Sequence, residues 1–223
     1  MPTNRTGVLA QYFYFFMSLL IAVVVTYGFS QRFDRQYLHP SHPKPFLLTI
    51  HACVFAAWVV FYIVQSALVR TGNVRIHRTL GWFGVALGIA IPVIGTITAV
   101  TMRRFDLQYT DLALTAPTLR TALLDLGSFT IPFALAVYCR ARPELHRRLM
   151  LIATCALTAA AFVRFPPVFH SWPYFYVGVD CLILLGVLRD LIVDRRVHAV
   201  YVCVLPLLVV AQLIVMNTFM HFL

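Results

Sequence analysis

Long apolar runs separated by short polar segments form the main pattern of this chain of 223 residues. The run "VLAQYFYFFMSLLIAVVVTYGF" is apolar on every helical face, whereas a surface helix of a soluble protein is apolar on one stripe. About 20 helical residues cross the roughly 30 Å hydrocarbon layer of a bilayer. The pattern predicts seven spanning helices, at residues 8–29, 45–69, 79–101, 118–139, 147–165, 173–190 and 198–221.

The composition supports the same class of protein. Hydrophobic residues make up 61% of the chain and charged residues 12%, with a mean hydropathy of +0.82, well outside the range of soluble domains. The first apolar run is too long for a signal-peptide core and lacks a cleavage site. We therefore predict an all-α polytopic membrane protein with one transmembrane domain, residues 1–223. The connection at residues 102–120 is predicted to be a short interfacial helix or an irregular loop, ended by Pro117.

The polar turns reveal an internal repeat. "VRIHRTLGW" and "PELHRRLML" each join a basic turn, a His-Arg-x-Leu sequence and an apolar run, and "RDLIVDRRVH" repeats the pattern faintly. The repeat predicts three helical hairpins closed on one side of the membrane. Repeated hairpins often carry related residues at matching depths.

Basic residues indicate the orientation. Of the 18 Lys and Arg residues, eleven lie at the N-terminus and in the three repeated turns, and seven lie on the other side. The positive-inside rule then places the N-terminus in the cytoplasm of a bacterium and the C-terminus outside its inner membrane. Topology signals and contacts to anionic lipid also account for the net charge of +10, so no nucleic acid partner is expected.

Polar residues inside the apolar spans are the first candidate site. On span two, His51, Trp58 and Gln65 share a helical face because seven residues nearly complete two turns. Ionisable groups facing lipid are costly, so such residues face one another or a wet cavity. Four residues are predicted to form this layer in the outer leaflet: His51, Asp125, Arg164 and Asp180. Trp58 and Gln65 are predicted to line the same cavity. The layer is either a structural ion pair, with Arg164 neutralising an aspartate, or a binding site for a proton, anion or small metabolite.

The histidines of the repeated turns are the second candidate site. A bis-histidine haem b site needs two neutral imidazoles at equal depth on facing helices, with arginines near the propionates. His77 and His146 meet the depth condition, and Arg78, Arg147 and Arg148 meet the charge condition. The same His-Arg pairs are also typical of membrane anchors on the cytoplasmic side.

Other motifs are less informative. The loop "HPSHPKP" carries His39 and His42, and His170 lies in the facing loop, but the prolines hold the first loop extended and no helical pair fixes the ligands. No metal site is therefore predicted. The five cysteines form no CxxC pair and are interpreted as packing residues. No nucleotide-binding or hydrolase motif is present, and the sequence leaves open whether the protein is an enzyme.

The order of these motifs resembles a known family. His51, Gln65, "HRTLG" at 77–81, "HRRLM" at 146–150 and Arg164 look like a family of bacterial multi-pass membrane proteins described as a domain of unknown function. The resemblance covers spans two to five and implies no known reaction.

A second resemblance is to haem proteins of the cytochrome b561 type. In that family, histidines on the second and fourth helices hold one haem and histidines on the third and fifth hold another. His77 and His146 open spans three and five, whereas His51 on span two faces Asp125 on span four. The resemblance implies one haem, on the side of the repeated turns.

Three functions therefore remain as hypotheses. The first is a small haem-binding redox protein or an assembly factor of a respiratory complex, and the second is a carrier or sensor that uses the outer layer. The third is an accessory subunit that docks another membrane protein. Its docking surface would be the small face of span three, formed by Gly81, Gly84, Gly88 and Gly95, because small residues let helices approach closely.

Overall fold

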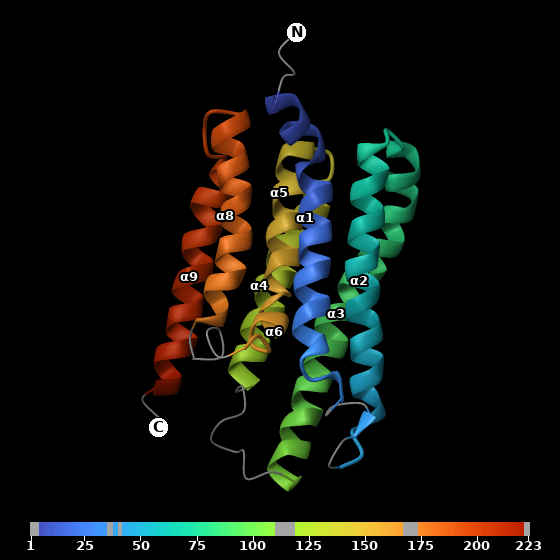
Figure 1. The fold of residues 1–223 in the computed structure, drawn as a ribbon, viewed down its shortest axis with the longest axis vertical. Coiled ribbons are helices and arrows are strands. Elements are labelled where there is room, and N and C mark those ends of the chain that lie inside the picture. Colours follow the sequence, from blue (N-terminus) through green and yellow to red (C-terminus); the bar gives the residue numbers. More distant parts are fainter. Residues whose placement is uncertain (1–4, 35–37, 40–41, 110–118, 167–173, 221–223) are drawn as a thin grey trace.

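The computed structural model describes residues 5–34, 38–39, 42–109, 119–166 and 174–220. Within these residues the regular structure is helical and contains no strand. The helices are α1 (Arg5–Ser30), α2 (Phe46–Arg70), α3 (Val74–Tyr109), α4 (Leu119–Tyr138), α5 (Pro143–Ala156), α6 (Ala159–Phe162), α8 (Phe175–Val193) and α9 (Ala199–Met220). They run along a common direction as one bundle (Figure 1).

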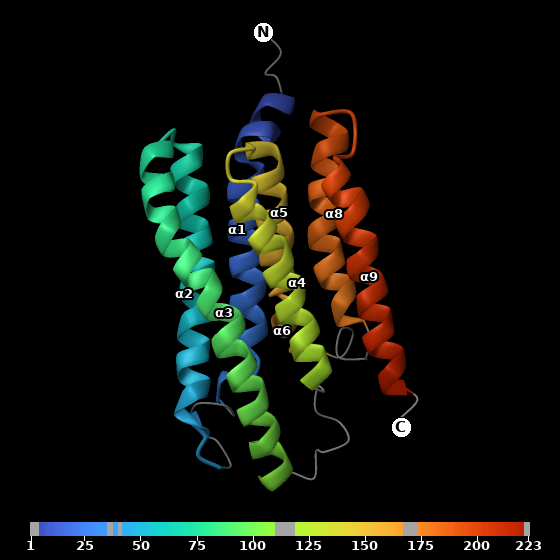
Figure 2. The ribbon, with the colours of Figure 1, turned by 180° about the vertical axis from the view of Figure 1, so that it is seen from behind.

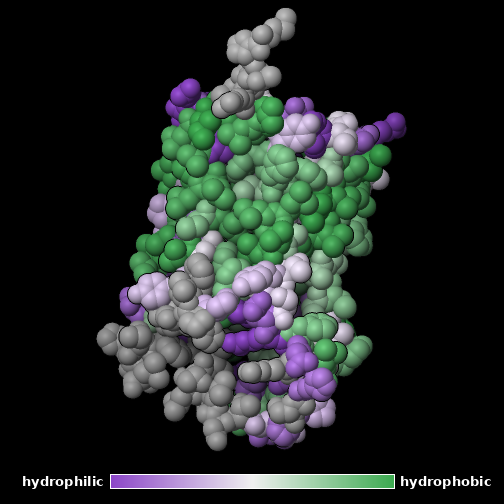
Figure 3. Space-filling view, in the orientation of Figure 1, coloured by the Kyte–Doolittle hydropathy of each residue, from purple (hydrophilic) through white to green (hydrophobic). Residues whose placement is uncertain are grey.

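The bundle has the dimensions and surface of a membrane domain. Six segments are long and apolar enough to cross a bilayer: α1, α2, α3, α4, the α5–α6 unit and α9. The remaining helix, α8, runs beside α9 (Figures 1 and 2), and its 19 residues extend for about 28 Å. Figure 3 shows a broad apolar band on the outside of the molecule. The prediction of an all-α polytopic membrane protein in contact with lipid is confirmed.

The three predicted hairpins are present. The turns between α2 and α3, α4 and α5, and α8 and α9 all lie at the end of the bundle where the chain begins (Figure 1). We call this the turn side. Gly72 closes the first turn with φ +78°, a conformation that glycine adopts without steric cost. In the third turn Arg195 takes a positive φ of 56°.

The third span is longer than predicted. Helix α3 continues through Arg103 and Arg104 to Tyr109 and projects beyond its neighbours at the far end (Figure 2). The segment predicted as an interfacial helix or loop is thus partly an extension of α3, and Lys44 Nζ packs 4.4 Å from the centre of the Phe105 ring. Residues 110–118, including the predicted break at Pro117, lie outside the described part of the chain.

The fifth span is divided into α5 and α6. At the break, Thr158 Oγ1 donates a hydrogen bond to the Cys155 carbonyl over 2.6 Å, and the Thr158 N–H also bonds that carbonyl. Such bonds from a threonine to the preceding turn compete with regular helix geometry. Helix α1 approaches this region closely, because a Cβ atom on Gly28 would lie 2.5 Å from the Ala161 oxygen.

The glycine face of α3 packs against the chain's own helices. A Cβ atom added to Gly84 would lie 2.3 Å from Phe61 of α2, and one added to Gly88 would lie 2.2 Å from Phe133 of α4. Gly95 likewise faces Leu126 of α4, whereas a Cβ atom on Gly81 meets no atom within 4 Å. Gly84, Gly88 and Gly95, three positions of the predicted docking surface, therefore already pack against other helices of the same chain.

Candidate functional site

His77 and His146 lie side by side on the turn side of the bundle. Each occupies the first turn of its helix, α3 or α5, and their ring centres are 6.3 Å apart with an angle of 80° between the ring planes. His146 Nδ1 lies 2.9 Å from the Ala136 carbonyl oxygen. Because a carbonyl only accepts, Nδ1 carries a proton, and in the neutral ring Nε2 keeps its lone pair.

Unpaired polar atoms surround this pair. The His77 ring lies near the backbone of Gln65, across the α2–α3 turn. His77 Nδ1 and both polar atoms of the Gln65 side chain are buried without a hydrogen-bond partner in the described structure. Leaving such an atom unpaired costs about 1–3 kcal/mol. The turn-side end of α2, α3 and α5 therefore offers donors and acceptors that a ligand or water can satisfy.

The predicted propionate-binding arginines have different surroundings. Arg78 is exposed and is close enough to act electrostatically on His77. Arg147 donates to Glu144 Oε2 over 2.5 Å and lies 5.3 Å from the centre of the Tyr14 ring. Arg78 is thus available to an anionic ligand, whereas Arg147 shares its charge with a carboxylate.

A buried charge cluster joins α5 to α8 on the same side. Arg148 is buried, and its Nε and Nη2 atoms each donate to Asp190 over 2.8 Å. It also donates to Asp194 over 2.9 Å and to Glu144 Oε2 over 2.6 Å. Arg189 adds hydrogen bonds to Asp190 and Asp194. The cluster thus binds the two helices through paired charges.

This cluster was not among the predicted sites, although the sequence carries a signal for it. Glu144 and Arg148 are four residues apart, and so are Asp190 and Asp194, a spacing that places each pair on one helical face. A helix carrying two acids on one face, in a chain with few acids, needs a basic partner on a neighbouring helix. Arg148 at the end of "HRR" was the available candidate.

The two aspartates of the predicted outer layer bind neutral partners. Asp125 of α4 accepts a hydrogen bond from Tyr176 of α8 over 2.7 Å, and Asp180 of α8 accepts one from Gln212 of α9 over 3.2 Å. The contacts of these carboxylates do not include Arg164. Within the described part of the chain, the first alternative for the layer, an ion pair between Arg164 and one of these two aspartates, is therefore not formed.

Arg164 and His51 lie together at the end of α1 and α2 that is opposite the turn side. Arg164 lies 4.4 Å from the centre of the Phe29 ring, and its Nη1 donates to the Ala160 carbonyl. It is close enough to act electrostatically on His51, which stacks on Phe55 with ring centres 4.1 Å apart.

The structure separates Trp58 and Gln65, which are predicted to line the same cavity as this layer. Trp58 is 1% exposed and packs edge-on against Phe129 and Phe133, at 5.1 Å and 5.5 Å between ring centres. Trp58 is a core residue. Gln65 lies on the turn side next to His77, so it belongs with the histidine pair and not with His51.

The loop histidines have partners of other kinds. His39 Nδ1 lies 2.9 Å from Asp34 Oδ1, and His42 stacks on Tyr109 with ring centres 4.9 Å apart. Position 170 lies outside the described residues. Among the residues that the structure does describe, no three His, Cys, Asp or Glu side chains are grouped as metal ligands.

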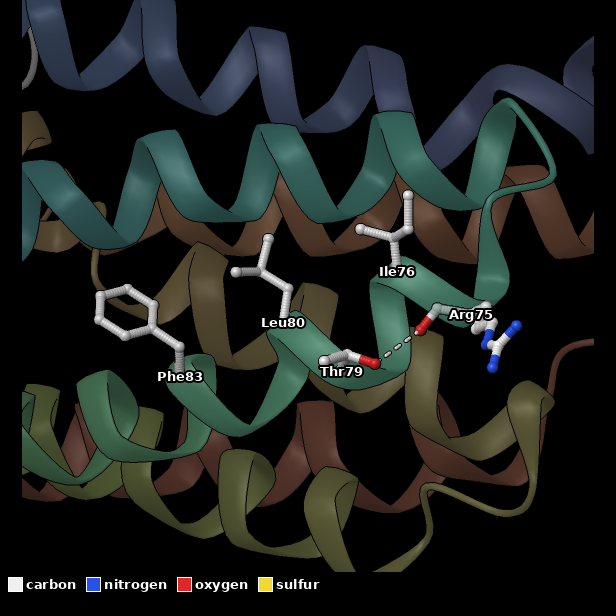
Figure 4. A pocket seen from close by; sticks show the side chains of 5 residues that line it. All are labelled: Arg75, Ile76, Thr79, Leu80 and Phe83. Atoms are coloured by element: carbon white, nitrogen blue, oxygen red, sulfur yellow. Dashed lines mark hydrogen bonds between the residues drawn. The ribbon is translucent and has the colours of Figure 1, made fainter.

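An open hollow of about 440 Å³ lies on α3 (Figure 4). Ile76, Leu80 and Phe83 supply its apolar lining, and Thr79 Oγ1 donates to the Arg75 carbonyl over 3.2 Å. The Arg75 side chain lies at the end nearest the α2–α3 turn (Figure 4). This lining fits a surface in contact with lipid chains and brings no reactive groups together.

Comparison with known proteins gives no match: no protein-family model, no curated protein and no solved structure corresponds to this chain. The function is therefore argued from the geometry of the sites above.

Proposed function

We propose that the protein is a small haem-binding membrane protein, a redox carrier or an assembly factor of a respiratory complex, whose iron ligands are His77 and His146. The observation that carries the proposal is the 6.3 Å distance between the two ring centres. Because metal–nitrogen bonds are about 2 Å long, two imidazoles at this distance would be close enough to bind one metal ion together. The resemblance to proteins of the cytochrome b561 type supports the same pair of ligands.

The hydrogen bonding of His146 also fits a ligand. Metal-binding histidines usually donate the second ring N–H to a carbonyl or carboxylate, which fixes the ring and its tautomer. His146 does so through Nδ1 to Ala136, and Nε2 is left to bind a metal. On His77 the buried Nδ1 atom has no partner among the described residues, so this ring also has an unused nitrogen.

The chain's own groups would hold and tune the cofactor. His77 and His146 would bind the iron, Arg78 would offer a charge to a propionate, and Gln65 would offer an amide to the same region. Haem, when bound, supplies one-electron transfer. We further propose that the turn side faces the cytoplasm of a bacterial inner membrane, which places this chemistry on the cytoplasmic side.

The test is a reduced-minus-oxidised absorption spectrum of the full chain purified after expression with ample haem. We expect the bands of a bis-histidine haem in the parent protein and their loss in His77→Ala and His146→Ala. His51→Ala and His198→Ala are matched controls that keep the bands. A parent protein without a Soret band, or bands that survive both ligand substitutions, contradicts the proposal.

The outer aspartates favour a second candidate, a carrier or sensor that binds a proton or a small solute. Asp125 and Asp180 lie in an apolar bundle, and each has one neutral hydrogen-bond partner. Carboxylates inside membrane helices commonly mark proton pathways. Infrared difference spectra between alkaline and acid pH should show carboxyl protonation that Asp125→Asn and Asp180→Asn remove. Unchanged spectra in both variants would leave these residues with a structural role.

A further inference from the structure

A cavity of about 420 Å³ lies on the turn side between the start of α5 and the α8–α9 turn. It is distinct from the histidine pair, since neither His77 nor His146 lines it. The lining residues are charged or titratable side chains: Glu144, Arg147, Arg148, Asp194, Arg196 and His198.

The carboxylates of this cavity are already paired with arginines. Glu144 accepts from both Arg147 and Arg148, and Asp194 accepts from both Arg148 and Arg189. Paired carboxylates repel an anion much less than free ones, because the neighbouring guanidinium groups compensate their charge. The acids therefore leave the cavity open to an anionic ligand.

The cavity and its buried floor carry one more cation than anion. The cations are Arg147, Arg148, Arg189 and Arg196, and the anions are Glu144, Asp190 and Asp194. The extra charge is that of Arg196, which no hydrogen bond or ion pair joins to another described residue. Arg147 adds a buried Nε–H that has no partner in the described structure.

His198 adds an uncharged donor. Its Nδ1 atom accepts a hydrogen bond from the Val200 backbone N–H over 3.2 Å, so the ring carries its proton on Nε2. Burial, assisted by the charge of Arg148, lowers the pKa of His198 below its ordinary value. The imidazole is therefore neutral near pH 7 and keeps an N–H group to offer.

We propose that this cavity binds a phosphate group through Arg147, Arg196 and His198. Guanidinium groups bind phosphate oxygens through charge-assisted hydrogen bonds, and the excess positive charge matches an anion. The cavity lies where α5 and α9 begin, at the level where lipid phosphates lie, and basic pockets between spanning helices are known to take lipid head groups. A volume of about 420 Å³ admits an esterified phosphate as well as the free ion.

Binding to the full chain in an uncharged detergent tests the proposal. The probes are inorganic phosphate, measured against sodium chloride at equal ionic strength, and short-chain phosphatidylglycerol, measured against phosphatidylcholine of the same chain length. Native mass spectrometry or calorimetry gives the dissociation constants. We expect Arg196→Gln to weaken binding about tenfold, as the loss of one charge-assisted contact does. Arg195→Gln is the matched control, because it removes the same charge one residue away from the cavity lining.

The outcomes distinguish the two sources of phosphate. Preference for phosphatidylglycerol over phosphatidylcholine, lost in Arg196→Gln and kept in Arg195→Gln, supports a lipid head group. Saturable binding of inorganic phosphate with the same dependence on Arg196, and no preference between lipids, supports a free phosphate ligand. Equal losses in the two variants, or no saturable binding of any probe, overturn the proposal.

Discussion

Arg148 shows how a single charge is accommodated inside this bundle. Its guanidinium is buried and donates to three carboxylates, two of which belong to or directly follow α8. A buried ion is expensive to remove from water, and the attraction of its partners offsets the cost only when the hydrogen bonds are well made. The pairing of α5 with α8 depends on this residue.

Replacement of Arg148 by methionine is expected to destabilise the protein by about 3–5 kcal/mol, because the buried Asp190 loses both hydrogen bonds from Arg148 and keeps only Arg189 as a cationic partner among the described residues. Unfolding in mixed micelles with increasing sodium dodecyl sulfate measures the change. The double variant Arg148→Met/Asp190→Leu should recover part of the loss, since the two changes are coupled. A single variant as stable as the parent would show that the cluster contributes nothing.

His198 predicts a dependence of stability on pH. Burial lowers the pKa of this ring in the folded protein, whereas the unfolded chain takes up the proton at about pH 6.5. The unfolded state then binds more protons below this pH, so the stabilisation present above pH 6.5 is lost as the pH falls toward the folded-state value. Protonation also removes the lone pair that accepts from Val200.

The measurement is the free energy of unfolding between pH 7.5 and pH 5, in the parent and in His198→Gln. Glutamine retains an acceptor but does not titrate in this range. We expect a shallower decline in the variant. Identical pH profiles would mean that other groups carry the dependence.

The closeness of His77 and His146 could be predicted from the sequence, whereas the partners of Asp125 and Asp180 could not. His77 and His146 are equivalent positions of a repeat, and a repeat predicts equal depth without knowledge of packing. For Asp125, Asp180 and Arg164, the position along each span predicts depth in the membrane but not direction around the bundle. Tyr176 and Gln212 became partners of the aspartates because rotation about the helix axes decides which side chains meet.

At the scale of helices, α3 is positioned by its glycines. Phe133 lies against Gly88 and is itself held by Trp58 and by Phe129, whose ring centre is 5.3 Å away. The ring has little freedom to move aside, so the closeness of α3 and α4 depends on the missing side chain. The small-residue pattern predicted this closeness, although not which helix would be the neighbour.

Gly88→Ala is expected to lower the free energy of unfolding by about 1–3 kcal/mol, the usual cost of overpacking a core. Gly81→Ala is the control in the same helix: its Cβ atom meets nothing within 4 Å, and alanine favours the helix by up to about 1 kcal/mol. Steric trapping or detergent unfolding compares the two. If the two substitutions change the free energy of unfolding equally, Phe133 does not pack against Gly88 in the protein.

Hydropathy predicted the number of spans well but their ends and interruptions less well. The average hydropathy stays high through Leu157 and Thr158, so it does not reveal the helix break at which the Thr158 hydroxyl donates to the Cys155 carbonyl. It falls near residue 101, because Arg103, Arg104 and Asp106 are polar, although the backbone of α3 remains helical to Tyr109. Helix formation and membrane burial are separate properties at both places.

At the scale of the whole molecule, the bundle is polarised. The histidine pair, the charge cluster and the cavity beside His198 all lie on the turn side, whereas Asp125, Asp180 and His51 lie in the other half. The C-terminal end of α9 lies at the opposite end from the start of α1 (Figure 1), as an odd number of crossings requires. One side of the membrane therefore receives both the proposed haem site and the proposed phosphate site.

The excess of basic residues on the turn side predicts that this side faces the cytoplasm. In a bacterial host, alkaline phosphatase fused after Leu223 should be active and green fluorescent protein at the same position dark. Fusions that end within the α4–α5 turn, at Arg142, should give the reverse pattern. If the reporters give opposite results at both positions, the histidine pair and the phosphate cavity face outward. A free phosphate ligand would then have to come from outside the cell, whereas a lipid head group would remain available in the outer leaflet.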